Sequence, residues 1–251
     1  MLVFGVTLGL LTGTLLGLLG GGGSIIAVPI MVYVLGFDAK TAIATSLVVV
    51  GIASFLAAIS HYRRESVLIR TAIYFGVAGA LGSFFGALIG KQIPNDVQLL
   101  LFSMVAALTG YLMIRRRSES SEPEGKVALK NAGLRVFFAG LGSGILTGLL
   151  GVGGGFIIVP ALTFVVGLSI REAVGTSLVV IGMNSLVGAA TYAGFIRWGG
   201  NVMPYVVGTL AAAPIAGHFS QYVRQRELKT VFAVTLLAIS AFMFVKQMVH
   251  F

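Results

Sequence analysis

Apolar segments long enough to cross a lipid bilayer follow one another from the first residue of this chain to the last. A membrane-spanning helix needs roughly 20 consecutive apolar residues, and stretches such as 68–90 reach that length. Only 10% of the 251 residues are charged, whereas a soluble domain carries about a quarter. The segments lack the alternation of a membrane β-barrel. The sequence therefore predicts an all-α polytopic membrane protein.

The chain contains an internal repeat. Residue n aligns with residue n + 131 without a gap, and half of the positions in 17–52 are identical to their equivalents in 148–183. The run TSLVV, for example, occurs at 45–49 and again at 176–180. We therefore predict one integrated transmembrane domain made of a first repeat at 1–114, a polar linker at 115–133 and a second repeat at 134–251.

Each repeat holds five apolar segments, of which the second is unusually short. About 12 helical residues cover only ~18 Å, less than the ~30 Å hydrocarbon core. The first two segments of each repeat are thus predicted to form a broken or re-entrant helix hairpin, followed by three transmembrane helices, which gives eight to ten apolar segments in total. The segments are 2–19, 25–36, 40–60, 68–90 and 97–114, then 134–150, 156–168, 172–194, 203–222 and 228–249.

The second repeat is predicted to be inverted relative to the first, because the number of net crossings per repeat is odd. With the linker placed inside, 13 of the 17 basic residues fall inside and 4 outside, in agreement with the positive-inside rule. Both termini then lie outside and the linker 115–133 is cytoplasmic. The net charge of +9 is explained by this topology, so no nucleic-acid partner is expected. Inverted repeats are typical of secondary transporters, whose site lies near the midplane.

Two glycine-rich motifs interrupt the apolar sequence, GLLGGGGSIIAVP at 17–29 and GLLGVGGGFIIVP at 148–160. Consecutive glycines destabilise a helix by about 1 kcal/mol each relative to alanine, and a helix that restarts after them presents unpaired N–H groups and a positive dipole end to an anion. Close helix packing is the alternative, and it is the better explanation for glycines spaced four apart. The motifs predict a binding site at Gly22, Gly23, Ser24, Gly153, Gly154 and Gly155.

Polar side chains inside the following segments complete the predicted site. Thr45, Ser46, Thr176 and Ser177 occur at the same offset from each glycine run, ~10 Å into their helices. Their hydroxyls could donate to an anion or bond back to a carbonyl of the previous turn. Asn184 is equivalent to an alanine in the first repeat, and its amide at membrane depth indicates either substrate contact or a helix–helix hydrogen bond.

Enzyme chemistry is not expected. The chain has no cysteine, and its three histidines are scattered, so neither a metal centre nor a nucleophile with its base is predicted, and no cofactor is implied. No Asp, Glu, Lys or Arg falls in the middle of a predicted span. Proton coupling would therefore use a peripheral residue such as His61 or Glu172, or the acid–base chemistry of the substrate.

The two glycine motifs, each followed about 16 residues later by ATSLVV or GTSLVV, resemble those of the sulfite exporter TauE/SafE family. The resemblance covers nearly the whole chain and implies an inner-membrane permease for sulfur-containing anions such as sulfite, sulfoacetate or taurine-derived sulfonates. Its expected partners are the small anion and membrane lipid, and a homo-oligomer is left open. An anion channel with the same core is the main alternative, and an intramembrane enzyme or a scaffold protein is less favoured.

Overall fold

A computed structural model of the protein describes residues 2–115, 129–151, 154–199 and 202–250. Within these ranges the chain is helical and has no β-strand, which confirms the all-α prediction. The first half contains α1 (Leu2–Leu19), α2 (Gly22–Pro29), the π-helical turn η1 (Ile30–Val34), α3 (Ala39–Tyr62), α4 (Ile69–Gly90) and α5 (Asn95–Arg115). The second half contains α6 (Leu129–Leu150), α7 (Gly155–Phe164), α8 (Ile170–Thr191), the 3-10 turn η2 (Ala193–Phe195), α9 (Val202–Phe219), the 3-10 turn η3 (Ser220–Tyr222) and α10 (Gln225–His250).

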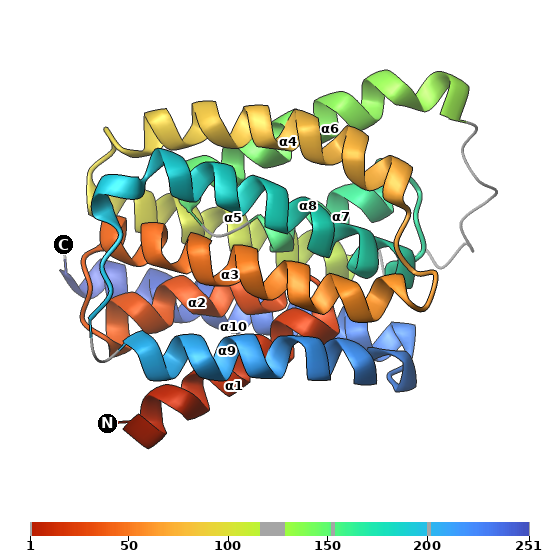
Figure 1. Ribbon diagram of the computed structural model, residues 1–251. Helices are drawn as coiled ribbons and strands as arrows, with labels where there is room; N and C mark the ends of the chain where they lie inside the picture. The colour runs from red at the N-terminus through yellow and green to blue at the C-terminus, as the bar shows by residue number, and fades with distance from the viewer. Residues whose placement is uncertain (1, 116–128, 152–153, 200–201, 251) are drawn as a thin grey trace.

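Most helices coincide with the predicted apolar segments to within a few residues, but α6 is longer than expected. It begins at Leu129, inside the predicted linker 115–133. Its first turns extend beyond the neighbouring helices in Figure 1, and Leu134 there is 70% exposed. These turns carry Lys130 and Arg135 among apolar residues, so they lack the continuous apolar signal that marks a span.

Two of the central helices begin at side-chain caps, which set the depth of the residues that follow. The Asp38 carboxylate accepts a hydrogen bond from the Thr41 N–H at 3.1 Å at the start of α3. At the start of α8, Ser169 and Glu172 form a capping box, with each side chain bonded to the backbone N–H of the other residue. Such caps satisfy N–H groups that have no partner inside the helix. Glu172 therefore serves as a helix cap.

Seven helices of the described residues are long and apolar enough to cross a membrane. They are α1, α3, α4, α5, α6 from Gly133, α8, and α9 continued to Tyr222. Shorter apolar helices lie at Gly23–Val34, Gly155–Phe164 and Thr230–Lys246. The protein is thus a multi-pass membrane protein in which short helices accompany the full spans, as the short second segments predicted.

Two helix pairs join the first half of the chain to the second through glycine faces. A Cβ added to Gly9, Gly13 or Gly17 of α1 would overlap the backbone of α9, and Gly140, Gly144 and Gly148 of α6 lie in the same way against α4. Small residues four apart allow helix backbones to approach closely in lipid. The packing interpretation of these spaced glycines is confirmed, and each half of the chain is interlocked with the other.

The helices α3 and α8 lie at the centre, between the α1–α9 pair on one side and the α4–α6 pair on the other (Figure 1). They run antiparallel: Leu47 lies against Gly188, and Gly51 lies against Ser185 and Leu186 farther back along α8. Because α3 and α8 are equivalent in the repeat, an antiparallel course is what an inverted repeat requires. The orientation of each half across a bilayer stays a prediction.

Single cysteines test this orientation, because the chain contains no cysteine of its own. Glu65 lies in the connection between α3 and α4, and Gly199 lies in the equivalent connection between α8 and α9; both are exposed. In an inverted repeat these connections face opposite sides of the membrane. We expect a membrane-impermeant maleimide added to intact cells or right-side-out vesicles to label Gly199→Cys but not Glu65→Cys.

Detergent-solubilised samples of both variants provide the control, since each thiol must label fully there. Labelling of both variants, or of neither, in intact vesicles would place the two connections on one side and contradict the inverted repeat. Labelling of Glu65→Cys alone would keep the inversion but reverse the predicted orientation of the whole chain.

Candidate functional site

The chain breaks its helical path at equivalent places in the two repeats. Gly20 ends α1 and Gly151 ends α6, and both have φ of +68°. Glycine has no Cβ and adopts this left-handed conformation without strain, whereas other residues rarely do. The next helices restart within a few residues, α2 at Gly22 and α7 at Gly155. The predicted helix breaks are thus present at both glycine runs.

Neither restarted helix has a side-chain cap. The residues before them, Gly21 and Gly154, make no capping hydrogen bond with a side chain. The first backbone N–H groups of a helix have no partner within the helix. The starts of α2 and α7 therefore offer N–H donors and positive dipole ends, which is the arrangement that binds anions at helix N-termini.

The two breaks touch each other. A Cβ added to Gly21 would overlap the backbone of Gly155, and a Cβ added to Gly155 would overlap the Gly21 Cα. The predicted site residue Gly22 is the first residue of α2, Gly154 is the N-cap of α7, and Gly153 lies outside the described residues. The structure therefore brings the two glycine runs together, as a site shared between the repeats would need.

Gly23 and Ser24 have local partners. A Cβ added to Gly23 would overlap the Thr12 carbonyl oxygen and would lie 2.7 Å from the Leu16 backbone N. Gly23 therefore packs against α1. The Ser24 hydroxyl is buried and donates to the Gly21 carbonyl oxygen at 2.7 Å. In this conformation the Ser24 hydroxyl is engaged with its own helix break.

Two serines connect each repeat to the helix break of the other. The Ser46 hydroxyl lies 2.9 Å from the Ile43 carbonyl oxygen and 3.3 Å from that of Gly151. Its equivalent, Ser177, lies 2.8 Å from the Val174 carbonyl oxygen and 3.1 Å from that of Gly20. Each hydroxyl donates a bifurcated hydrogen bond, to a carbonyl oxygen of its own helix and to the carbonyl oxygen of the left-handed glycine across the interface. The two hydroxyls therefore link the repeats reciprocally.

The threonines beside these serines point elsewhere. The Thr176 hydroxyl accepts a hydrogen bond at 3.1 Å from the N–H of Leu68, in the connection before α4. The Thr45 hydroxyl contacts the backbone of Arg197, in the equivalent connection before α9, with the N–H of Arg197 at 3.4 Å. Adjacent residues of a helix point about 100° apart. Of each predicted pair, only the serine faces a helix break.

Asn184 is a fully buried amide without a partner. Its Nδ2 and Oδ1 atoms make no hydrogen bond in the described part of the protein, and a Cβ added to Gly79 of α4 would lie 2.6 Å from the Asn184 Nδ2. An unsatisfied buried polar group costs about 1–3 kcal/mol. The helix–helix hydrogen bond that the sequence left open for this side chain is not formed.

His61 and Tyr192 are equivalent residues that hold the ends of the first helices. The buried His61 donates from Nε2 to the Gly17 carbonyl oxygen of α1 at 3.0 Å. Tyr192 accepts a hydrogen bond at 3.1 Å from Gln98, which also donates to the Leu149 carbonyl oxygen of α6. Burial raises the pKa of Tyr192 and the bond from Gln98 lowers it less, so the phenol stays protonated at neutral pH. The sequence did not assign these two residues a shared role, although their equivalence at n and n + 131 was a usable signal.

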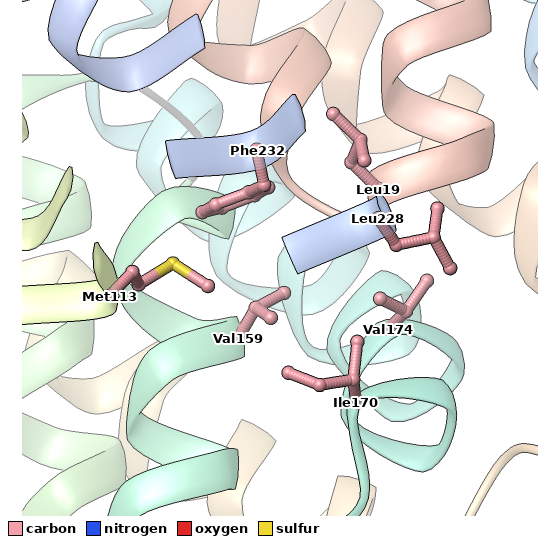
Figure 2. Close-up of a pocket in the computed structure, with 7 residues that line it drawn as sticks. All are labelled: Leu19, Met113, Val159, Ile170, Val174, Leu228 and Phe232. Atoms are coloured by element: carbon pink, nitrogen blue, oxygen red, sulfur yellow. The ribbon is translucent and has the colours of Figure 1, made fainter. Parts of the chain in front are cut away.

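A small apolar pocket lies beside the first break. Figure 2 shows Leu19 at the end of α1 and Val174 of α8 among its lining side chains, which come from five helices. The pocket has a cavity volume of about 10 Å³, room for at most one water molecule. Its lining is Leu19, Met113, Val159, Ile170, Val174, Leu228 and Phe232. Neither its size nor its chemistry suits an anion.

The described side chains offer no metal centre. No group of three or more His, Cys, Asp or Glu residues is placed to hold a metal ion within the described ranges. The groups at the breaks are backbone N–H groups and serine hydroxyls, while the Asn184 amide lies against Gly79 of α4. These groups can replace the hydration shell of an anion by hydrogen bonding.

Comparison with known proteins gives one family. The profile of the family described as "Sulfite exporter TauE/SafE" matches residues 5–243. Two proteins of Xylella fastidiosa, each named "Probable membrane transporter protein", are 34% and 32% identical to this chain, and each alignment covers 92% of this chain and 90% of the relative. "Probable membrane transporter protein YdhB" of Bacillus subtilis is 27% identical over 90% of this chain and 93% of its own length. No solved structure matches the chain significantly.

Proposed function

Because this chain belongs to the sulfite exporter TauE/SafE family of membrane transporters, we propose that it is a secondary transporter of small sulfur-containing anions, such as sulfite or the organosulfonate sulfoacetate. The observation that carries the proposal is the contact between two uncapped helix starts, α2 and α7, at Gly21 and Gly155. In transporters, half-helix N-termini that meet near the midplane bind anionic substrate groups. A sulfite or sulfonate group presents three oxygens that accept such hydrogen bonds.

The serines at the breaks supply the remaining donors. When the breaks separate, the hydroxyls of Ser46 and Ser177 leave the carbonyl oxygens of Gly151 and Gly20 and donate to the anion. The same hydroxyls then return to the carbonyls after release. The protein thereby exchanges hydrogen bonds to carbonyl oxygens for hydrogen bonds to the anion, and neither state leaves the two hydroxyls unpaired in lipid, where unpaired groups are costly.

The closed breaks favour a carrier over a channel. Gly21 and Gly155 are in contact, and the pocket beside the first break holds at most one water molecule. In this proposal the contact of Gly21 with Gly155 represents a closed state, and an anion reaches the starts of α2 and α7 once the helices move apart. Movement of the α3–α8 centre against the flanking pairs would open the breaks to one side at a time, which is alternating access.

Counterflow in proteoliposomes tests this function. Vesicles that contain the purified protein and a high internal concentration of sulfite should accumulate radiolabelled sulfite or sulfoacetate transiently from outside. Protein-free vesicles should not accumulate the label, and a panel with sulfate, thiosulfate, taurine and carboxylate analogues ranks the substrates. Ohmic, non-saturating conductance would identify a channel, and counterflow of carboxylates alone would refute the sulfur-anion assignment.

A further inference from the structure

A cleft separate from the helix breaks lies between the starts of α4 and α6. It has a volume of about 310 Å³ and is lined by Arg70, Thr71, Tyr74, Gly133 and Val136. A water molecule occupies roughly 30 Å³ in the liquid, so the cleft has room for a polar group of several heavy atoms. None of these residues belongs to the proposed transport site.

The cleft brings together basic and polar side chains that have no partners. Arg70 is exposed and has no carboxylate partner in the described part of the chain. Thr71 is only 8% exposed, and its hydroxyl, in the lining of the cleft, makes no hydrogen bond to any described residue. This hydroxyl is therefore available to donate to a ligand in the cleft. Both groups would be satisfied by a ligand that carries negative oxygens.

A second arginine lies at the same level. Phe75 and Gly79 of α4 lie against Gly140 and Gly144 of α6, so the two helices run parallel with a constant offset of 65 residues between the contacting positions. Arg135 of α6, which is exposed, therefore lies level with Arg70 of α4. Two cations on adjacent helices repel each other, and an anion between them relieves this repulsion.

The surface below the cleft is apolar. Ile73 and Val77, one and two turns farther along α4, are 52% and 50% exposed. Tyr74, 65% exposed, is the kind of amphipathic residue that collects where lipid headgroups meet acyl chains. A ligand with a phosphate and acyl chains would place the phosphate between the arginines and its chains along Ile73 and Val77.

We propose that this cleft binds the phosphate of an anionic phospholipid headgroup at the linker side of the membrane. The equivalent place between α9 and α1 does not repeat this pair of arginines, because Asn201 is equivalent to Arg70 and Phe4 is equivalent to Arg135. The site is therefore expected on one side of the membrane only. Basic pockets between transmembrane helices on the cytoplasmic side are a recurring type of headgroup site. The lipid would hold the starts of α4 and α6 together, at the end of one of the two interlocking pairs.

Thermal unfolding of the purified full-length protein in detergent tests this proposal. Added phosphatidylglycerol should raise the midpoint in a saturable way, and phosphatidylcholine should not. Replacing Arg70 or Arg135 by glutamine should weaken the apparent affinity for phosphatidylglycerol about fivefold for each arginine removed. Thr71→Val should weaken it as well. Arg63→Gln is the matched control, because Arg63 is an exposed arginine on the same predicted face that belongs neither to the cleft lining nor to α4 or α6.

Two further comparisons show whether the bound phosphate belongs to a lipid or is a free anion. Inorganic phosphate at the same concentration should stabilise the protein far less than the lipid, and equal stabilisation would show that a free anion is the ligand and overturn the lipid assignment. Equal weakening by Arg63→Gln and Arg70→Gln would reduce the effect to general surface charge and also refute the site. Because the readout is thermal unfolding, it is independent of whether the transported substrate has been identified.

Discussion

Gly155→Ala is expected to lower sulfite counterflow at least about fivefold. The added methyl group would overlap the Gly21 Cα and lie 2.8 Å from the Ile181 Cδ1. The first of these neighbours is backbone and cannot move aside by rotating a side chain. Overpacking of this kind costs about 1–3 kcal/mol, which corresponds to roughly 5–150-fold in an equilibrium constant. Because the methyl group acts where the two breaks touch, the closed state should be destabilised.

Gly142→Ala is the matched control, since Gly142 lies on α6 and an added Cβ meets no atom within 4 Å. Flux is measured per folded, monodisperse protein, and thermal unfolding in detergent is recorded alongside it. Gly21→Ala places a methyl group in the same contact from the opposite side. It keeps the prediction testable if Gly155→Ala does not fold. Wild-type flux in Gly155→Ala and Gly21→Ala would show that the contact between the breaks plays no part in transport.

Removal of both serine hydroxyls, in Ser46→Ala with Ser177→Ala, is expected to lower counterflow about 30-fold, and each single replacement about fivefold. These values follow from a net contribution of about 1 kcal/mol per hydrogen bond, because each replacement leaves the carbonyl oxygen of Gly151 or Gly20 without its partner. The anion also loses the donors that we propose for it. The affinity for sulfite should therefore fall together with the maximal rate.

Ser143→Ala separates this effect from the loss of any buried hydroxyl. Ser143 is buried in α6, and among the described residues its hydroxyl bonds only to the Gly140 carbonyl oxygen one turn back. We expect wild-type flux in that variant. If the alanine variants at Ser46 and Ser177 behaved like Ser143→Ala, the serines would be ordinary helix residues and the reciprocal link would have no functional role.

The sequence predicted those parts of the fold that depend on local properties. Lipid demands helices of a given length, so apolar stretches located nearly all of them, whereas the caps at Asp38 and Ser169 that begin α3 and α8 were found in the structure. Glycine is the residue that most easily adopts positive φ. The breaks at Gly20 and Gly151 could therefore be placed from the two motifs.

The details of the candidate site depend on contacts between distant residues, and these were not predictable. The sequence shows the pair Thr45–Ser46, but the rotation of α3 decides which hydroxyl faces a break; Ser46 meets Gly151, which lies 105 residues away. His61 meets Gly17 at a separation of 44 residues, so its role as a partner for the end of α1 had no local signal. The lack of a partner for Asn184 likewise follows only from the packing of α4 against α8.

The interlocking of the two halves has a consequence for biosynthesis. Helix α6 finds its partner α4 already made, but α1 begins at Leu2 and its partner α9 begins only at Val202. At about 5–20 residues per second, the ribosome needs roughly 10–40 s to cover that distance. Until then the glycine face of α1 has no α9 to pack against. The packing of α1 is therefore completed only when the second half of the chain has been made, and a chain that stops before α9 would leave Gly9, Gly13 and Gly17 without their packing partner.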